Sequence, residues 1–367
     1  MIVWLSLIAY MFVVKIIMGE LDTKKKQRKY LIFAGVAVAA VIGLRYPYYE
    51  EVGDLNWYYY LYGVIVRTEW HSLLSYNTYF TPGYLILNKL LGYIAPWQQS
   101  IIVFEGAFCV FCVCFYIYKN SDHPFLALLF FITQGTMGFC LTGFRQAIAM
   151  SLLLLSTECI KKRKLFPFLS IVLVATTIHS TAIVFIVSYF FANRPMTKLN
   201  NLFSWIFPFI LLFFTRVLAN VGNNIFDLSV NYTNTYVGFL SGIVQVSIYV
   251  IIILLYQTVP KRRLTNMSKQ VLSIPKKQQE IGSKLLAYNM TVYGLALYAM
   301  RYIVQAFERV SLYFSVYSIV ALSEVIYYYD DKKSVKLLSF LAAYFSILLF
   351  IWRMSKEYWG DYRFFWM

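Results

Sequence analysis

Residues 1–29, MIVWLSLIAYMFVVKIIMGELDTKKKQRK, decide the fold class. An almost entirely apolar segment over residues 1–18 is followed by a turn rich in lysine and arginine, and no basic stretch precedes it. A cleavable signal peptide carries its positive charges before the apolar segment. The observed order instead predicts a first membrane helix whose start lies outside the cytoplasm.

The composition of the whole chain extends this prediction. Of its 367 residues, 60% are hydrophobic and only 14% are charged. In soluble domains about 45–50% of the residues are apolar and about 25% are charged. So few charged residues cannot cover a soluble surface, which excludes an ordinary soluble enzyme, a disordered protein and a nucleic-acid-binding module. The five cysteines lie in or beside apolar runs and are expected to be packing residues rather than a metal or redox site. We therefore expect an all-α, polytopic membrane protein in which residues 1–367 form a single transmembrane domain.

The apolar segments give a count of membrane spans, because a helix crosses a hydrocarbon core of ~30 Å in about 20 residues. The twelve candidate spans are residues 1–18, 30–46, 100–118, 124–141, 145–160, 165–180, 181–193, 201–218, 238–257, 285–303, 310–329 and 335–352. Two long connections remain, residues 47–99 and residues 258–284.

The basic residues predict the orientation of these spans. Most of the 33 Lys and Arg residues fall in the turns that follow odd-numbered spans, as the positive-inside rule requires. Both termini are therefore predicted to be extracytoplasmic, with residues 47–99 outside and residues 258–284 forming a basic cytoplasmic loop. This topology accounts for the net charge of +16 without a nucleic-acid partner.

The connection 47–99 is rich in tyrosine and tryptophan. Its segments near 55–67 and 83–95 are predicted to form helices that lie on or dip into the outer leaflet. An interfacial aromatic belt explains these side chains, but aromatic rings also stack on sugars. The sequence leaves both interpretations open.

Several ionisable residues are predicted to share one depth in the membrane. Arg45, Arg145, His179 and Arg301 each lie 15 to 17 residues from the nearest basic turn, or roughly 22–26 Å along a helix, and Arg309 lies somewhat higher. Ionisable groups within membranes are usually functional, and guanidinium groups bind phosphate through paired hydrogen bonds. We therefore expect a site near the outer face for a lipid phosphate or diphosphate.

The sequence has no GxxxxGK[ST] phosphate loop and no HExxH motif. We therefore expect no nucleotide, no metal and no other cofactor in the reaction.

Four short elements resemble those of Wzy-like, EpsG-type polysaccharide polymerases. The sequences RYPYYEEVGDLNWY at 45–58 and GFRQAIA at 143–149 resemble the R…GxD…Y and GxRQxxA elements of that family. The sequences HSTA at 179–182 and RVSLYF at 309–314 resemble its H-S/T-x-A and RxxxYF elements. The four elements follow the order in which they occur in the family.

The resemblance implies a GT-C-like, multi-pass glycosyltransferase of the bacterial plasma membrane. Its substrates would be oligosaccharide repeat units on polyprenyl diphosphate, joined at the extracytoplasmic face into exopolysaccharide, capsule or O-antigen. The implied partners are the lipid-linked donor and acceptor, membrane lipid, and other polysaccharide-assembly proteins.

The resemblance and the chemistry together assign roles to the matching residues. Arg145 and Arg309 would stabilise the diphosphate leaving group, and His179 would be a base or would position the acceptor. The further candidates for substrate binding are Arg45, Asp54, Gln146, Arg301 and Tyr313.

Three other classes of function remain as alternatives. A flippase for lipid-linked oligosaccharide would place its site near the bilayer midplane between repeats, but the polar residues are predicted near one face and no repeat is visible. The second class is a related outer-face transferase, either an O-antigen-ligase-like enzyme or a membrane acyltransferase. The ligase would need similar arginine and histidine residues, and the sequence hardly separates it from a polymerase. A purely structural membrane protein is disfavoured by the number of arginines within helices.

Overall fold

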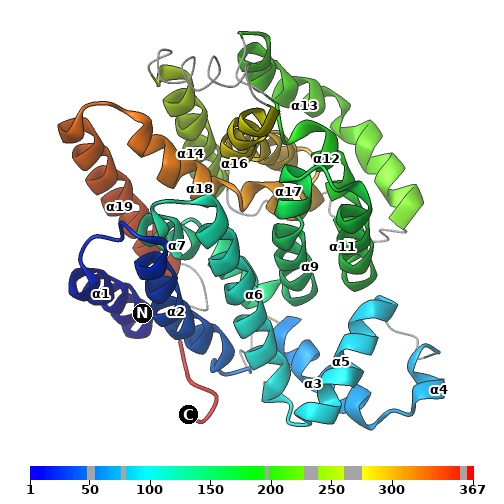
Figure 1. The fold of residues 1–367 in the computed structure, drawn as a ribbon. Helices are drawn as coiled ribbons and strands as arrows, with labels where there is room; N and C mark the ends of the chain where they lie inside the picture. Colours follow the sequence, from blue (N-terminus) through cyan, green and yellow to red (C-terminus); the bar gives the residue numbers. More distant parts are fainter. Residues whose placement is uncertain (48–53, 76–79, 195–197, 227–238, 260–274, 356–361) are drawn as a thin grey trace. The chain divides into compact units, whose positions relative to one another are not determined.

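The computed structural model describes the chain except for residues 48–53, 76–79, 195–197, 227–238, 260–274 and 356–361. Within the described residues the regular elements are all helical, which confirms the all-α prediction (Figure 1).

The helices follow the chain in this order: α1 (Ile2–Met18), α2 (Lys24–Gly43), α3 (Asp54–Arg67), α4 (Trp70–Leu73), α5 (Pro82–Ile94), α6 (Gln99–Asn120), α7 (Pro124–Thr133), α8 (Thr136–Thr142), α9 (Phe144–Leu155), α10 (Thr157–Lys161), α11 (Leu165–Ile178), η1 (Ser180–Val187), α12 (Ser188–Phe191), α13 (Lys198–Phe226), α14 (Phe239–Thr258), α16 (Pro275–Ala299), η2 (Met300–Tyr302), α17 (Ala306–Ser315), α18 (Ser318–Val325), η3 (Ile326–Tyr328) and α19 (Lys332–Met354).

Each of the twelve predicted spans coincides with one or more of these helices. Among the described residues, α6, α13, α14 and α19 are long and apolar enough to cross a membrane, and two bent pairs, α7 with α8 and α17 with α18, raise the number to six. Three shorter apolar helices correspond to further predicted spans. These helices support a multi-pass membrane protein, while the count of twelve and the side of the termini stay predictions.

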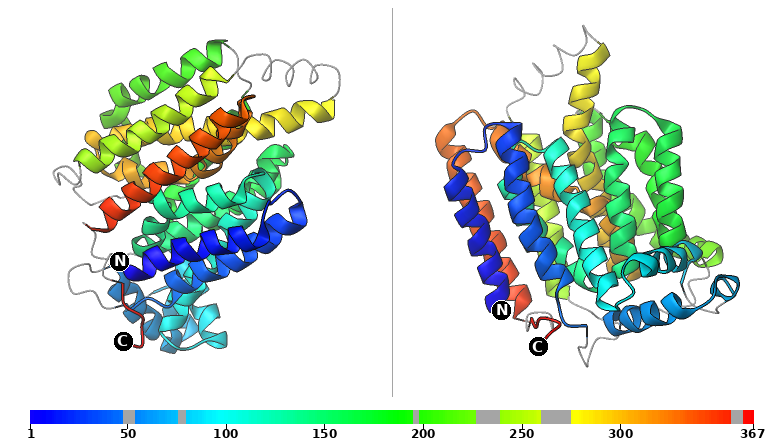
Figure 2. Two further views of the ribbon diagram at one scale, coloured as in Figure 1. Left: turned by 90° about the vertical axis from the view of Figure 1, so that its left-hand side faces the viewer. Right: turned by 60° about the horizontal axis from the view of Figure 1, so that its bottom comes forward.

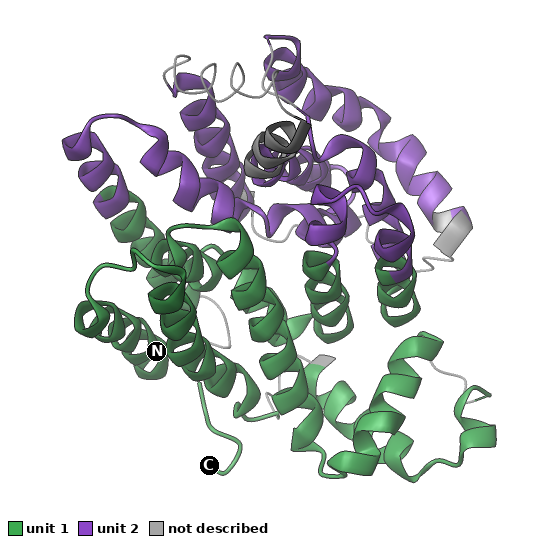
Figure 3. Ribbon diagram, in the orientation of Figure 1, with its two compact units in different colours: residues 1–155, 171–180, 341–367 green, residues 156–170, 181–340 purple. Residues whose placement is uncertain are grey.

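The helices form two compact units that alternate along the sequence (Figure 3). Unit 1 contains residues 1–155, 171–180 and 341–367, and unit 2 contains residues 156–170 and 181–340. Three boundaries between the units fall inside α11, η1 and α19, and the fourth lies between α9 and α10. Each unit is described by itself below.

In unit 1, α2 and α6 lie side by side and run in opposite directions (Figure 2). A Cβ atom on Gly43 would lie 3.0 Å from the Cα of Val103, and one on Gly106 would lie 2.9 Å from the nitrogen of Gly43. Only glycine therefore permits the helices to approach this closely. At the other end of the pair, Lys24 Nζ lies 2.9 Å from Asp122 Oδ1.

The segment 362–367 returns to the end of α2. Phe364 and Arg45 form an isolated antiparallel bridge, and the Tyr362 hydroxyl donates a hydrogen bond of 2.8 Å to the carbonyl oxygen of Val41. This segment therefore fixes the chain on both sides of Arg45.

The aromatic-rich connection contains three helices, α3, α4 and α5. The first and third match the predicted segments 55–67 and 83–95. Lys89 Nζ of α5 donates to the carbonyl oxygens of Val66 and Thr68, at 2.8 and 2.6 Å, at the end of α3. Because these carbonyls have no partner within the helix, this contact ties α3 to α5.

Within the predicted basic loop, α16 begins at Pro275, ahead of the predicted span 285–303. The polar sequence PKKQQEIGSK over 275–284 suggests a loop by composition, but proline is favoured in a first helical turn, and lysine, glutamine and glutamate propagate helices well. The part of the predicted loop at 260–274 lies outside the described residues.

Unit 2 is organised around α16. A Cβ atom on Gly294 would lie 2.8 Å from the Cα of Ser315, so α16 and α17 cross closely at this glycine. The Asn289 amide donates to the carbonyl oxygens of Ala192 and Arg194, at 2.8 and 2.9 Å. These bonds attach the end of α12 to α16.

Candidate functional site

Just before Arg145 the chain bends once and its helix is interrupted once. Helices α7 and α8 meet at 51°, and Gly135 between them has a φ of +95°, which favours glycine. Helix α8 ends at Thr142, and the nitrogen of Ala147 donates to the carbonyl oxygen of Gly143 at 2.8 Å. Arg145 therefore lies in the first turn of α9, where the helix dipole favours a bound anion.

The guanidinium of Arg145 lies on an aromatic cluster formed by Tyr58, Phe80, Tyr84 and Phe144, here called the aromatic cradle. Its Cζ is 4.5 Å from the centre of the Phe80 ring, and its Nε donates to the Tyr58 hydroxyl at 3.4 Å. The rings of Tyr58 and Phe144 stack at 5.0 Å, and those of Phe80 and Tyr84 at 5.6 Å. The cradle orients a half-buried guanidinium through its face and one edge.

The segment that supplies Phe80 also supports His179. The hydroxyl of Thr81 donates to the carbonyl oxygen of Ile178 at 2.6 Å. His179 directly follows α11 and is half-buried. Arg145 and His179, which the sequence predicts to act together, are thus linked within unit 1 through two consecutive residues, Phe80 and Thr81.

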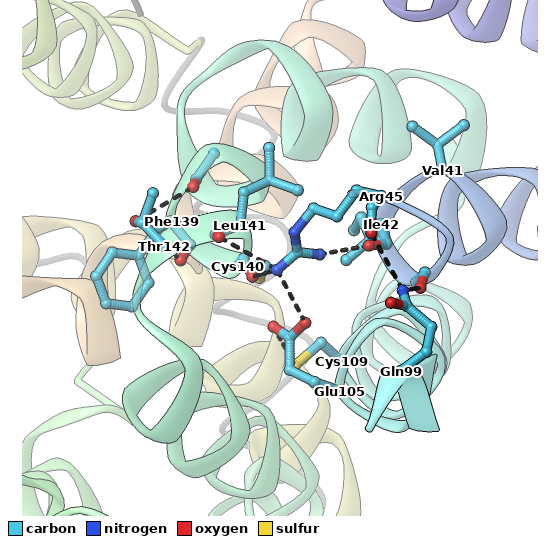
Figure 4. Close-up of polar contacts among 12 residues, drawn as sticks. Val41, Ile42, Arg45, Gln99, Glu105, Cys109, Phe139, Cys140, Leu141 and Thr142 are labelled. Carbon is cyan, nitrogen blue, oxygen red and sulfur yellow. Dashed lines mark hydrogen bonds and ion pairs between the residues drawn. The ribbon is translucent and has the colours of Figure 1, made fainter. Parts of the chain in front are cut away.

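Arg45 is buried, with 2% of the residue exposed. Its guanidinium donates to the carbonyl oxygens of Ile42, Leu141 (3.1 Å) and Cys140 (3.5 Å), as Figure 4 shows. Its Nη2 also lies 3.8 Å from Oε2 of Glu105. Arg45 therefore holds the last turn of α8 against the end of α2 and the middle of α6.

The ring of Phe144 connects Arg45 to the aromatic cradle. The Cζ of Arg45 lies 5.3 Å from the centre of this ring, and the same ring stacks on Tyr58, which accepts the hydrogen bond from Arg145. Arg45 and Arg145 are therefore neighbours of one aromatic cluster, although their own hydrogen-bond partners in unit 1 differ.

Glu105 is the residue of this site that the sequence analysis missed. It is fully buried in α6, and its Oε1 lies 3.8 Å from the Cys109 Sγ. The ligand atoms of Glu105, Cys109 and Cys140 lie within 4.8 Å of one another, but the guanidinium of Arg45 already provides a positive charge beside this carboxylate, and a metal cation would be repelled by it. A single acidic residue in the apolar run 100–118 is the signal that could have revealed the pair.

Gln146 and Asp54 are the other two predicted site residues of unit 1. Gln146 follows Arg145 in α9 and is buried. Asp54 is the first residue of α3, and its side chain lies outside the part of the structure that is described.

In unit 2, Arg301 forms an ion pair that the sequence analysis did not anticipate. Its Nη1 donates to Glu308 Oε1 at 2.8 Å and also to the Tyr298 hydroxyl. Arg309, which directly follows Glu308 in the sequence, is exposed on α17. Glu308 therefore pairs with Arg301, whose side chain is 6% exposed, and directly precedes the exposed Arg309 in the sequence.

Tyr313 is fully buried in unit 2. Its hydroxyl and Thr181 Oγ1 share a hydrogen bond of 3.0 Å, and Thr181 follows His179 by two residues. The buried tyrosine thus anchors the start of η1, so two of the four motif elements meet through this bond.

The chain matches the model of the EpsG family over residues 28–364. The chain belongs to the EpsG family. No curated protein and no solved structure shows significant similarity to it. The matched region of this EpsG-family chain includes all four motif elements, so the resemblance predicted from them is confirmed. Membership supports a polysaccharide-polymerase-like role in a membrane.

The predicted site residues of this EpsG-family protein belong to both units. Unit 1 contains Arg45, Asp54, Arg145, Gln146 and His179. Unit 2 contains Arg301, Arg309 and Tyr313. A diphosphate contact shared by Arg145 and Arg309 therefore stays a prediction.

Proposed function

We propose that this EpsG-family protein polymerises oligosaccharide repeat units carried on polyprenyl diphosphate at the outer face of the bacterial plasma membrane. The observation that carries the proposal is the arrangement around Arg145. A guanidinium held in the first turn of a helix, with its face on an aromatic ring, is suited to paired hydrogen bonds with a diphosphate. The family membership supports the polysaccharide product.

In the proposed reaction, the acceptor hydroxyl oxygen forms a bond to the anomeric carbon of the donor sugar. The bond from that carbon to the diphosphate oxygen breaks, and its electron pair leaves with the polyprenyl diphosphate. Arg145 and Arg309 stabilise this charge. Guanidinium groups that are already in place do so without any reorganisation of the protein during the reaction. His179 accepts the hydroxyl proton, or it orients the hydroxyl while the departing diphosphate takes that proton.

The remaining candidates take supporting roles in this proposal. Arg45, paired with Glu105, fixes α8, which directly precedes the helix that carries Arg145. Arg301, paired with Glu308, fixes α17, which carries Arg309. Asp54 and Gln146 bind a sugar or hold an arginine. Tyr313 positions the start of η1 behind His179.

The product of the purified protein tests the proposed function. Incubation with lipid-linked repeat units should give a ladder of chains that differ by one repeat. Transfer of one finished block to another acceptor would identify a ligase instead, and transbilayer movement of labelled lipid without chain extension would identify a flippase. Either result would overturn the proposal.

The hydrogen bond from Thr81 to the carbonyl of Ile178 gives a prediction about His179. Thr81→Val keeps the size of the side chain but removes this bond, whose net contribution to stability is about 0.5–1.5 kcal/mol. We expect a folded protein whose initial polymerisation rate falls several-fold, because the residue next to His179 loses its support.

A matched control for this variant is Thr68→Val, which removes a threonine-to-carbonyl bond of 2.9 Å after α3. It should lower the unfolding temperature by a similar amount and leave the rate almost unchanged. A Thr81→Val protein with the wild-type rate would contradict the proposed support of His179.

A further inference from the structure

An outward-opening groove of about 630 Å³ lies between α2 and α6 of unit 1. Its lining includes four small residues, Gly35, Ala39, Ala107 and Cys114. A Cβ atom on Gly35 would lie 2.9 Å from the Cys114 Sγ. The groove therefore exists because α2 and α6 touch through small residues, whose side chains do not fill the space on the outer side of the contact.

The sides of the groove are apolar and exposed. Ile32, Val36 and Phe111 line it, and at least half of each residue is accessible. Helix α6 is one of the four helices with the length and composition of a membrane span. In a bilayer, such side chains beside a groove face lipid tails rather than water.

The length of the groove matches one leaflet. It extends along α2 from Arg28 to Ala39, which is about 16 Å at 1.5 Å per residue. Half of a ~30 Å hydrocarbon core is about 15 Å. One acyl chain can therefore lie along the groove from a headgroup at the Arg28 end.

Two cations stand at that end of the groove, Arg28 on α2 and Lys119 on α6, and both are exposed. No carboxylate of the described residues forms an ion pair with either of them, whereas the neighbouring Lys24 is paired with Asp122. Lys119 Nζ lies 5.8 Å from the centre of the Tyr118 ring. A phosphate oxygen would complete the pairing of both cations.

We infer that this groove binds one anionic membrane phospholipid. Its phosphate would lie between Arg28 and Lys119, and one acyl chain would run over Gly35 and Ala107. The inference rests on the shape and charge of the groove and not on the proposed polymerase activity.

The test uses the purified full-length protein in detergent and measures the binding of fluorescent phosphatidylglycerol and phosphatidylcholine. We expect phosphatidylglycerol to bind at least about tenfold more tightly, because each of the two cations attracts the net negative charge that phosphatidylcholine lacks. Arg28→Gln/Lys119→Gln should remove this preference. Both residues are exposed, so the variant should fold normally.

Two further variants separate the groove from general electrostatic attraction. Lys25→Gln/Lys29→Gln removes two charges of the same basic cluster that do not line the groove, and it should keep the preference for phosphatidylglycerol. Ala39→Phe fills the groove and should weaken the binding of phosphatidylglycerol several-fold, and Val36→Trp should do the same at a more exposed position.

Four results would overturn the inference. They are equal binding of the two lipids, an equal loss in the control pair, unchanged binding in both filled variants, and a dimer that the filled variants convert to a monomer. The last would show that a second copy of the chain occupies the groove.

Discussion

Arg145→Ala is expected to abolish polymer formation in a protein that still folds and inserts into the membrane. The side chain is half-buried and lies on the surface of the aromatic cradle, so its removal leaves the packing of Tyr58 on Phe144 in place. Loss of one preorganised donor to a developing negative charge typically lowers a rate by about 10²–10³-fold. Over the many transfers that a long chain needs, such a loss leaves single repeat units as the product.

The charge alone should not restore this activity. Arg145→Lys keeps a cation but lacks the planar guanidinium, which lies over Phe80 in the wild type and whose geometry allows two parallel hydrogen bonds to a phosphate. We expect short products and a rate well below that of the wild type. The measurement is the length distribution of products from lipid-linked repeat units, with the unfolding temperature recorded for each variant.

The control is Arg67→Ala, which removes an exposed arginine from the end of α3 in the same unit. This variant should make polymer of normal length. Full-length polysaccharide from Arg145→Ala would refute the role assigned to Arg145, and a misfolded Arg145→Ala protein would show that the side chain is needed for the cradle itself.

Arg45→Met is expected to destabilise the protein more than any surface change. It would leave the carboxylate of Glu105 buried without its cation and would remove the hydrogen bonds to Cys140 and Leu141. Breaking a buried ion pair from one side costs about 3–5 kcal/mol. We expect little folded protein, or a large drop in unfolding temperature in detergent.

A double-mutant cycle tests the pair directly. Arg45→Met/Glu105→Leu removes both charges and should recover a large part of the lost stability, because no unpaired charge remains. The matched control is Lys24→Met, which breaks the exposed pair with Asp122 and should change the stability by at most about 1 kcal/mol.

The same variant separates two roles for Arg45. An Arg45→Met protein that is as stable as the wild type but inactive would contradict the structural pair and favour a direct contact with substrate, as the sequence analysis considered. An unstable protein that the second substitution rescues would establish Arg45 as a positioning residue.

The positions of the helices could be predicted well from the sequence, because long apolar runs between polar turns leave few alternatives. The bend inside the predicted span 124–141 was not predicted. Its cause is Gly135, whose positive φ ends α7, and a lone glycine in an apolar run does not reveal whether the helix continues. The early start of α16 at Pro275 was hidden by its polar composition.

The candidate site shows a similar limit. Motifs identified Arg145 and His179, but their connection through Phe80 and Thr81 depends on how α5 packs against α11. Glu105 and Glu308 pair with Arg45 and Arg301, which the sequence distinguishes by their depth in the membrane. The number of residues between an arginine and the nearest basic turn predicts its depth in the membrane. It does not predict which neighbouring side chain already binds the guanidinium.

The return of residues 362–367 to the end of α2 has a consequence for the timing of biosynthesis. The hydroxyl of Tyr362 and the carbonyl of Val41 are 321 positions apart, and ribosomes add about 5–20 residues per second. The surroundings of Arg45 therefore stay incomplete for roughly 15–60 s after α2 has been made. During that interval a nascent chain would hold Arg45 without the closing segment 362–367, so this part of unit 1 is completed only when synthesis reaches its last residues.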